Sequence, residues 1–241
     1  MENVYDTNRE ESALQNWPRL SSPSYSSSRP APRWIPILGP SQVLVLQNFL
    51  SIQDTRSLVE YIQQEMKSQI DDKIDPLNPP PRPVPRPGYA FRDNDRIQFQ
   101  SLEFATMLWN NVHGEKITSG PRNNKRIRHA VGLSRNIRLY RYQKGQSFGA
   151  HYDESVTDIA GSHDGETETV SEYTVLIYLN GEKDSDLLGG ETVFYPKGVA
   201  VKPERGLLLV HKHGDECMLH EALIVDRGYK YVLRTDVVYE P

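Results

Sequence analysis

Apolar and polar residues alternate in short runs throughout the second half of the chain, from about residue 131. A period of two is typical of β-strands with one buried face, and glycine-containing breaks separate the runs. The runs are NIRLYRYQ, FGAHYDE, EYTVLIYLN, GETVFYP, GLLLVHKH, ECMLHEALIV and KYVLRTDVVY. The breaks contain Gly145, Asn180, Gly181, Gly189, Gly190, Gly206, Gly214 and Gly228. This half is therefore predicted to consist of short strands joined by turns.

The first half has apolar residues at helical spacing instead. Residues 52–70 and 101–112 each predict an amphipathic helix, because their apolar residues recur every three or four positions. The apolar faces consist of Leu58, Ile62 and Met66 in the first segment and of Leu102, Ala105, Leu108 and Trp109 in the second. Alternation over residues 43–47 predicts a strand before the first helix. Helices followed by many short strands predict a mainly β fold with flanking helices, the double-stranded β-helix or jelly roll.

Composition divides the chain into three parts. Residues 1–33 are rich in Ser and Pro and are predicted to form a disordered tail. Residues 34–130 should provide helices and a proline-rich loop that pack on the core, and residues 131–241 should form the β-helix. The run DPLNPPPRPVPRPGY is expected to be an extended loop, since proline lacks an amide hydrogen and has a fixed φ.

A long polar insert, residues 154–172, follows one of the predicted strands. Polar segments of this length are often loops that cover a site, so we expect it to be mobile and to close over a substrate. A solvated loop without such a role is the alternative. The acidic residues of the insert would favour neutral or basic substrates through steering. They are Glu154, Asp158, Asp164, Glu166, Glu168 and Glu172.

Charge and cysteine content narrow the class of protein. The net charge of −4 gives no basic field for nucleic acid, although RNNKRIRH at 122–129 is a local basic cluster. The single cysteine, Cys217, excludes an internal disulfide and fits a reducing compartment. No apolar run approaches the roughly 20 residues needed to span a bilayer, and the polar N-terminus lacks the apolar core of a secretory signal. A cytoplasmic or nuclear protein is therefore expected.

His151 and Asp153 are the candidate pair for a metal. Residues i and i+2 of a strand project from the same face with Cα atoms roughly 6.5–7 Å apart, which suits two ligands of one ion. His220 is the candidate third ligand, because two histidines and a carboxylate bind one face of Fe(II) and leave the opposite positions open.

Two further histidines are alternatives to His220. His211 and His213 share one face of the run GLLLVHKH, and Asp215 would be the nearby carboxylate. We interpret His213 as a supporting or core residue, because nothing after this pair reproduces the spacing of an anion anchor. His163 in the insert is expected to be solvated. Cys217 is expected to contribute buried packing.

A lysine follows His220 by ten residues (230 − 220) and could bind an anionic co-substrate. If the intervening turn reverses the chain, Lys230 lies beside the metal strand, and a buried ammonium there needs an anion. Arg234 shares its face and is the competing anchor, although it could instead pair with a core carboxylate such as Asp236. Tyr142 could add a hydrogen bond through its hydroxyl.

The order of these motifs resembles that of the Fe(II)/2-oxoglutarate-dependent dioxygenases, and most closely their prolyl 4-hydroxylase-like branch. The resemblance covers about residues 86–241 and is carried by YRYQKGQSFGAHYDES, YTVLIYLN, GGETVFYP, PERGLLLVHKH and MLHEALIVDRGYKYVLRTDVVY. It implies that His151, Asp153 and His220 bind Fe(II). It also implies that Lys230 binds the distal carboxylate of 2-oxoglutarate with help from Tyr142. Gly189, Gly190 and Thr192 would shape the turn and the cavity wall.

The activity implied by this resemblance is the hydroxylation of an unactivated C–H bond, coupled to conversion of 2-oxoglutarate and O2 into succinate and CO2. Ascorbate is a further candidate cofactor. A protein or peptide side chain, of the prolyl type, is the first expected substrate. A small molecule is the second, a nucleic acid ranks below both, and no membrane partner is expected. A jelly roll that binds without catalysing is the alternative from another class. The chain lacks the cysteines of the secreted collagen hydroxylases, which puts collagen in doubt as a substrate.

Overall fold

The computed structural model describes residues 33–39, 41–78, 81, 83–112, 130–162 and 165–240, together with 8, 9, 18 and 20. Within this part of the chain, most strands belong to two sheets. The larger sheet has the order β1-β5-β7-β17-β10-β14-β3-β2, with β6 paired to β17 and β9 paired to β10. The smaller sheet has the order β13-β12-β15-β8-β4, and β11 pairs with β16 in a separate ribbon. The expected double-stranded β-helix is thereby confirmed.

The bounds of the strands in the larger sheet are Asn8–Arg9 (β1), Arg33–Leu38 (β2), Val43–Gln47 (β3), Asp95–Gln100 (β5), Ala130–Leu133 (β6), Asn136–Gln143 (β7), Thr157–Ser162 (β9), Gly165–Tyr178 (β10), Leu208–Lys212 (β14) and Tyr229–Tyr239 (β17). The remaining strands are Arg92–Asp93 (β4), Ser147–His151 (β8), Leu188–Gly189 (β11), Thr192–Phe194 (β12), Val199–Val201 (β13), His220–Ala222 (β15) and Val225–Arg227 (β16). Short 3-10 turns cover Asp71–Lys73 (η2) and Gly214–Glu216 (η4).

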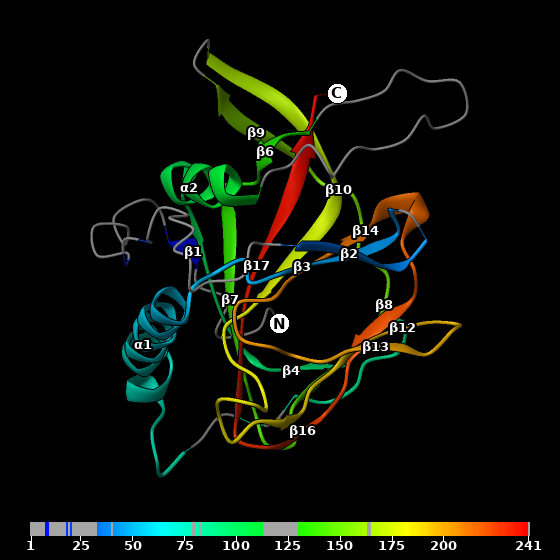
Figure 1. Ribbon diagram of the computed structural model, residues 1–241. Helices are drawn as coiled ribbons and strands as arrows, with labels where there is room; N and C mark the ends of the chain where they lie inside the picture. Colours follow the sequence, from blue (N-terminus) through cyan, green and yellow to red (C-terminus); the bar gives the residue numbers. More distant parts are fainter. Residues whose placement is uncertain are drawn as a thin grey trace.

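Two helices cover the outer face of the larger sheet, while the smaller sheet lies on its other side (Figure 1). Helix α1 (Ile52–Gln69) begins at Ser51, which forms a capping box with Asp54. Its expected apolar face is fully buried against the sheet. Helix α2 (Leu102–Val112) also forms as expected, but Leu102 is exposed and Phe104 takes its place in the core. Neither helix has the length and apolar character that crossing a bilayer would require.

The alternation along β7 and β17 gives the larger sheet two different faces. Ile137 and Leu139 of β7 pack with the helices, whereas Tyr140 and Tyr142 face the smaller sheet. The two strands are antiparallel neighbours, and Lys230 of β17 lies opposite Tyr142. Because side chains alternate along a strand, the residues at positions 230, 232 and 234 project into the space between the sheets. The functional groups of β17 therefore lie on its inner face.

Of the two predicted loops, the insert differs from the prediction and the proline-rich run agrees with it. The insert is not a loop, because residues 157–162 and 165–178 form a β-hairpin that continues the central strand β10 beyond the body of the fold (Figure 1). Backbone hydrogen bonds between the two strands of the hairpin satisfy the main-chain N–H and C=O groups. The polar sequence alone does not reveal this pairing. The proline-rich run lies between η2 and β4 without regular structure in its described residues, as expected. The expected tail falls almost entirely outside the described residues, and the basic cluster 122–129 and His163 do so completely.

The three-part division of the chain remains a prediction. Segment 34–130 supplies the two helices, but it also supplies β3 and β5, which lie inside the larger sheet. This part of the chain is therefore joined to the core by backbone hydrogen bonds as well as by helix packing.

Candidate metal centre and co-substrate cavity

Two neighbouring strands of the smaller sheet bring His151 and His220 together. The residues are direct partners in the antiparallel register of β8 and β15, and their ring centroids are 4.3 Å apart. Together with Asp153 they offer ligand atoms that all lie within 4.8 Å of one another. The structure thus assembles the three residues that the sequence singled out as metal ligands.

Asp153 reaches this cluster from a loop and not from the strand that was expected. Strand β8 ends at His151, and the backbone beyond it is fixed by contacts with the η4 segment. The Asp153 amide donates to Cys217 Sγ at 3.2 Å, and its carbonyl accepts a hydrogen bond from the Gly214 amide at 2.8 Å. The side-by-side geometry therefore depends on a distant segment of the chain and not on strand alternation.

The Asp153 carboxylate is buried and has strong partners. Thr174 Oγ1 donates to Oδ2 at 2.8 Å, and Arg234 Nη2 lies 3.1 Å from Oδ1. Burial alone would raise the pKa of Asp153, but Arg234 and the neighbouring histidines hold it well below its usual value. The carboxylate is therefore charged and fixed in orientation, as a metal ligand must be.

Backbone carbonyls orient both histidine rings toward this carboxylate. The Nδ1–H of His151 donates to Gly149 O at 2.8 Å and that of His220 donates to Met218 O at 2.9 Å. Each Nε2 then lies 3.6 Å from an Asp153 oxygen. Second hydrogen bonds of this kind are typical of metal-bound histidines, because they fix the tautomer and the ring orientation.

The two histidines differ in proton affinity. Burial, together with nearby His220, lowers the pKa of His151 to about 4. Burial also acts to lower the pKa of His220, but Asp153, Cys217 and the Met218 carbonyl outweigh it and raise the pKa to about 9. A neutral imidazole and a carboxylate on one side of a cavity can accept a divalent cation, and the cation would replace the proton of His220.

Lys230 is buried in the same cavity, and it forms no ion pair with a carboxylate of the described residues. Its Nζ donates to Gly190 O at 2.6 Å and lies 5.1 Å and 5.5 Å from the ring centroids of Tyr142 and Tyr178. Burial lowers its pKa from 10.5 to about 7. Since no ion pair of Lys230 occurs among the described residues, an anionic ligand would relieve this cost.

Arg234 is held by carboxylates on both sides. In addition to its contact with Asp153, Arg234 has its Nε 3.8 Å from Asp236 Oδ1. Arg138 Nη1 pairs with Oδ2 of the same aspartate at 3.1 Å. The expected pairing of Arg234 with Asp236 is present, but the shorter contact is with the candidate metal ligand. Arg234 therefore positions Asp153, and its charge is less available to an anion than that of Lys230.

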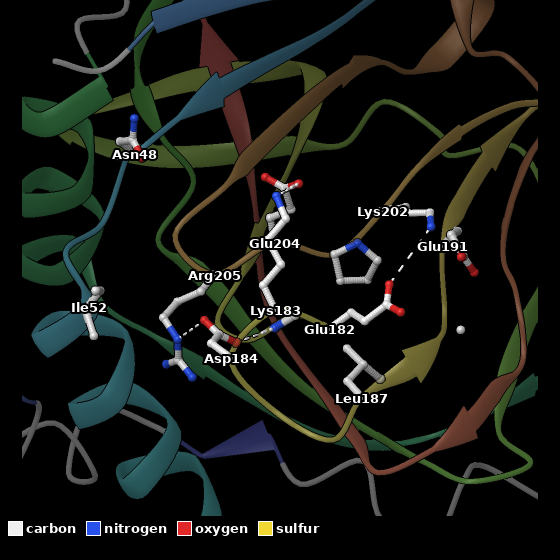
Figure 2. A pocket seen from close by; sticks show the side chains of 13 residues that line it. Asn48, Ile52, Glu182, Lys183, Asp184, Leu187, Glu191, Lys202, Glu204 and Arg205 are labelled. Carbon is white, nitrogen blue, oxygen red and sulfur yellow. Dashed lines mark hydrogen bonds and ion pairs between the residues drawn. The ribbon is translucent and has the colours of Figure 1, made fainter. Parts of the chain in front are cut away.

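A cavity of about 40 Å³ joins these groups. Its lining includes all six residues named from the sequence, His151, Asp153, His220, Lys230, Tyr142 and Arg234, together with Thr174, Thr192 and His211. A larger cavity of about 280 Å³ lies elsewhere, near Ile52 and the 181–184 turn (Figure 2). Several charged groups around that larger cavity pair with one another, as Arg205 does with Asp184 and Lys183 does with Glu204. The chemistry therefore favours the smaller cavity.

The sequence did not reveal how three further residues, Thr174, His213 and Cys217, join the centre. Thr174 of β10 bridges Asp153 to His213, whose Nδ1 lies 3.1 Å from Thr174 Oγ1. His213 thus supports the centre through Thr174, which agrees with its interpretation as a supporting or core residue. Asp215, the carboxylate considered beside it, is exposed. Cys217 is only partly buried and accepts the Asp153 amide, so it is more than packing. The polar position of Thr174 within an apolar strand was the available signal.

Comparison with known proteins shows similarity of sequence over part of the chain and similarity of fold over most of it. Residues 137–235 match the 2OG-Fe(II) oxygenase superfamily. A prolyl-4-hydroxylase from Pseudomonas putida superposes with a TM-score of 0.51 at 17% identity, covering 83% of this chain and 94% of its own. A prolyl hydroxylase from Trichoplax adhaerens, solved with a hypoxia inducible factor oxygen degradation domain peptide fragment, gives 0.52 at 16% identity, covering 82% and 83%. The comparison with curated protein sequences gives no match.

The matched segment runs from β7 to β17 and includes every candidate ligand and anchor described above. Its family uses Fe(II) with 2-oxoglutarate and O2. Residues 137–235 are thus similar in sequence to the 2-oxoglutarate- and Fe(II)-dependent oxygenases, and the chain shares the fold of the prolyl 4-hydroxylases.

Proposed function

We propose that His151, Asp153 and His220 hold Fe(II), that Lys230 and Tyr142 hold 2-oxoglutarate, and that the protein hydroxylates a side chain of a protein or peptide, of the prolyl type. The observation that carries this proposal is one cavity in which two oriented histidines and a charged carboxylate stand beside a buried lysine that has no ion-pair partner in the described part of the chain. The overall change would be R–H + 2-oxoglutarate + O2 → R–OH + succinate + CO2, which is balanced.

The residues of the chain have separable tasks in this reaction. Bound Fe(II) would supply the redox chemistry by which O2 is reduced at the expense of 2-oxoglutarate. Lys230 would bind the far carboxylate of the co-substrate as a point charge, and the aromatic rings around it exclude water. Arg234 and Thr174 would keep Asp153 in place. Gly190 presents its carbonyl to Lys230 at a φ of +76°, where a Cβ would lie 3.0 Å from Lys230 Cδ.

A peptide substrate is supported by two observations. The structural neighbours include a prolyl hydroxylase that was solved with a peptide. Tyr152, which stands between His151 and Asp153 in the sequence, is 62% exposed and is available to contact a substrate side chain. Incubation with a panel of proline-containing peptides and a panel of metabolites would test the proposal, with succinate and the hydroxylated product measured together. Succinate formation dependent on metabolites alone would favour the small-molecule alternative. The absence of succinate under all conditions would favour a binding module.

The binding of 2-oxoglutarate is expected to weaken above pH 7. Lys230 has a pKa of about 7 in the free cavity, so at higher pH a proton must be taken up when the anion binds. The KM for 2-oxoglutarate should be constant below this pH and rise roughly tenfold per pH unit above it. Kinetics between pH 6 and 9 would measure this rise. Lys230→Arg should remove the dependence, because an arginine stays charged throughout; an unchanged profile in that variant would exclude Lys230 as its source.

The hairpin β9–β10 is expected to contribute to substrate capture. Replacing residues 159–167 by a two-residue turn should lower kcat/KM for a peptide substrate and leave the KM for 2-oxoglutarate unchanged, because the co-substrate cavity lies in the body of the fold. The double variant Glu166→Lys/Glu168→Lys, which keeps the length, tests whether acidity steers basic substrates. Unchanged kcat/KM in the shortened variant would remove the support for a covering role.

A further inference from the structure

The proline-rich run between α1 and the smaller sheet has proline at every second position from 79 to 87, with arginine or valine at 82, 84 and 86. Its described prolines are exposed and lie outside the helices and strands. They are Pro81, Pro83, Pro85 and Pro87. Successive residues of an extended chain project to opposite faces, so the extended run presents prolines on one face and Arg-Val-Arg on the other.

The run leads directly into β4, the edge strand that pairs with β8 of the smaller sheet. Arg92 lies opposite Phe148 in this antiparallel pair, and Phe91 O accepts a hydrogen bond from the Gly149 amide at 2.7 Å. Gly149 precedes His151 by two residues, so their Cα atoms are about 7 Å apart along the strand. The end of the run is therefore held close to a candidate metal ligand.

A turn separates the prolines from the edge of β8. The Tyr89 amide donates to Arg86 O at 3.2 Å, and Gly88 has a φ of +80°. All described residues of the run are exposed, so opening of this turn would cost little buried surface. Pro87 is four residues from Phe91 (91 − 87), which an extended chain spans over about 14 Å. The nearest prolines can therefore reach the metal cluster while β4 stays paired with β8.

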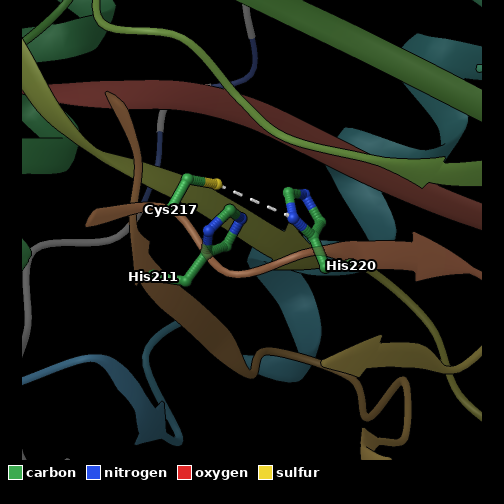
Figure 3. Close-up of side chains that lie close together, drawn as sticks. All are labelled: His211, Cys217 and His220. Atoms are coloured by element: carbon green, nitrogen blue, oxygen red, sulfur yellow. Dashed lines mark hydrogen bonds between the residues drawn. The ribbon is translucent and has the colours of Figure 1, made fainter. Parts of the chain in front are cut away.

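The candidate metal centre is closed on the side of β14 and more open on the side of β8. His211 of β14, which is 1% exposed, and Cys217 lie beside the His220 ring (Figure 3). The side chain of His220 is 5% exposed, whereas that of His151 is 14% exposed and the following Tyr152 is 62% exposed. A peptide would therefore reach the centre along β8, the strand that β4 borders.

The charges around the centre are complementary to those of the run. Glu154 and Glu221 each follow a candidate metal ligand in the sequence. Glu154 is exposed, and Glu221 is partly buried and lines the cavity. Neither glutamate forms an ion pair with a residue of the described part of the chain. An arginine on either side of a proline would find a carboxylate at this opening, as Arg86 would with Pro85 or Pro87 at the centre.

We propose that the protein hydroxylates its own proline-rich run, at Pro83, Pro85 or Pro87, within the same molecule. This inference rests on the proposed function and names a substrate for it. One oxygen atom of O2 enters a C–H bond of the proline ring, and the other enters the carboxylate of succinate that forms as 2-oxoglutarate loses CO2. Two electrons from the C–H bond and two from 2-oxoglutarate reduce the O2.

The full chain, produced under iron limitation and then given Fe(II), 2-oxoglutarate and O2 without any other substrate, tests this inference. Peptide mapping by mass spectrometry should find one added oxygen atom in residues 83–87, with one succinate formed for each oxygen gained. The triple variant Pro83→Ala/Pro85→Ala/Pro87→Ala should lose both the modification and this succinate. Pro76→Ala is the matched control, because Pro76 is exposed in the same connection but precedes the alternating run. It should behave as the original protein does.

An inactive chain in the same mixture tests whether the reaction is intramolecular. Isotope-labelled His151→Ala carries the run but lacks a proposed iron ligand, so it should stay unmodified while the original chain is modified. A short tether gives an effective concentration in the millimolar range, which at about 1 µM protein favours the chain's own run about 1000-fold. Equal modification of both chains would overturn the intramolecular assignment. Succinate without modified prolines, or oxygen added only elsewhere, would overturn the inference as a whole.

The triple variant, given a synthetic peptide of residues 80–90 or the peptides of the panel, separates this inference from the proposed function. If added peptides are hydroxylated while the prolines of the original chain stay unmodified, the inference fails and the proposed function stands. If no added substrate yields succinate and the original chain stays unmodified, both fail.

Discussion

His151→Ala is expected to abolish both iron retention and turnover while leaving the fold intact. The ring supplies one of three ligand groups within 4.8 Å, and alanine can neither replace that donor nor disturb the buried core, since His151 lies at the end of β8 at the cavity. Changes to groups that merely support a metal ligand cost about 10- to 100-fold in affinity, so loss of a ligand should cost at least as much. Metal content after desalting, succinate formation and the melting temperature would be measured together.

The control for this experiment separates the candidate distal ligands. His213→Ala should retain more iron than His151→Ala, because His213 contacts Thr174 and supports the carboxylate only through that residue. His220→Ala should lose iron as His151→Ala does. If iron were retained without His220 and lost without His213, the assignment of the distal ligand would be wrong.

Lys230→Ala should raise the KM for 2-oxoglutarate strongly and affect Fe(II) binding less. The lysine is the buried cation of the cavity that has no carboxylate partner among the described residues, so its removal leaves the far carboxylate of the co-substrate unpaired. Truncation of one member of a buried charge pair costs about 2 kcal/mol or more, which corresponds to roughly a 30-fold or larger rise in KM. Initial rates at varied 2-oxoglutarate, with saturating iron, would measure it.

Arg234→Ala is the matched variant on the same strand face, and its effect should fall on stability. The guanidinium lies 3.1 Å from Asp153 and 3.8 Å from Asp236, so its loss leaves buried carboxylates with fewer partners. Breaking such a pair costs about 3–5 kcal/mol, which a melting curve detects easily. The reverse pattern, with co-substrate affinity lost at Arg234 and kept at Lys230, would exchange the roles of the two residues.

The sequence predicted those parts of the site that depend on strand periodicity. The alternation in KYVLRTDVVY placed Lys230 and Arg234 on one face of their strand, and the register of β7 with β17 adds Tyr142 opposite Lys230. The helix spanning 52–70 was also recoverable, because Leu58, Ile62 and Met66 repeat at one helical turn.

Contacts between distant segments could not be read in the same way. Asp153 is fixed by Thr174 and Arg234, which are 21 and 81 residues away (174 − 153 and 234 − 153), and periodicity does not specify which strands become neighbours. The orientation of His211 depends on the register of β14 against β10, which is equally invisible in one sequence. The hairpin at 157–178 was missed because its two strands are joined by backbone pairing, which the polar sequence of the insert does not indicate.

The metal centre is built from both layers of the fold. His151 and His220 come from the smaller sheet, while Thr174 and Arg234 hold Asp153 from the larger one. An ion bound there would link the two layers. At a free ion concentration of 100 times its Kd, it would add about 2.7 kcal/mol to the free energy of unfolding. Iron starvation would then shorten the lifetime of the folded chain as well as abolish its activity. The amount of folded protein would therefore follow the iron supply.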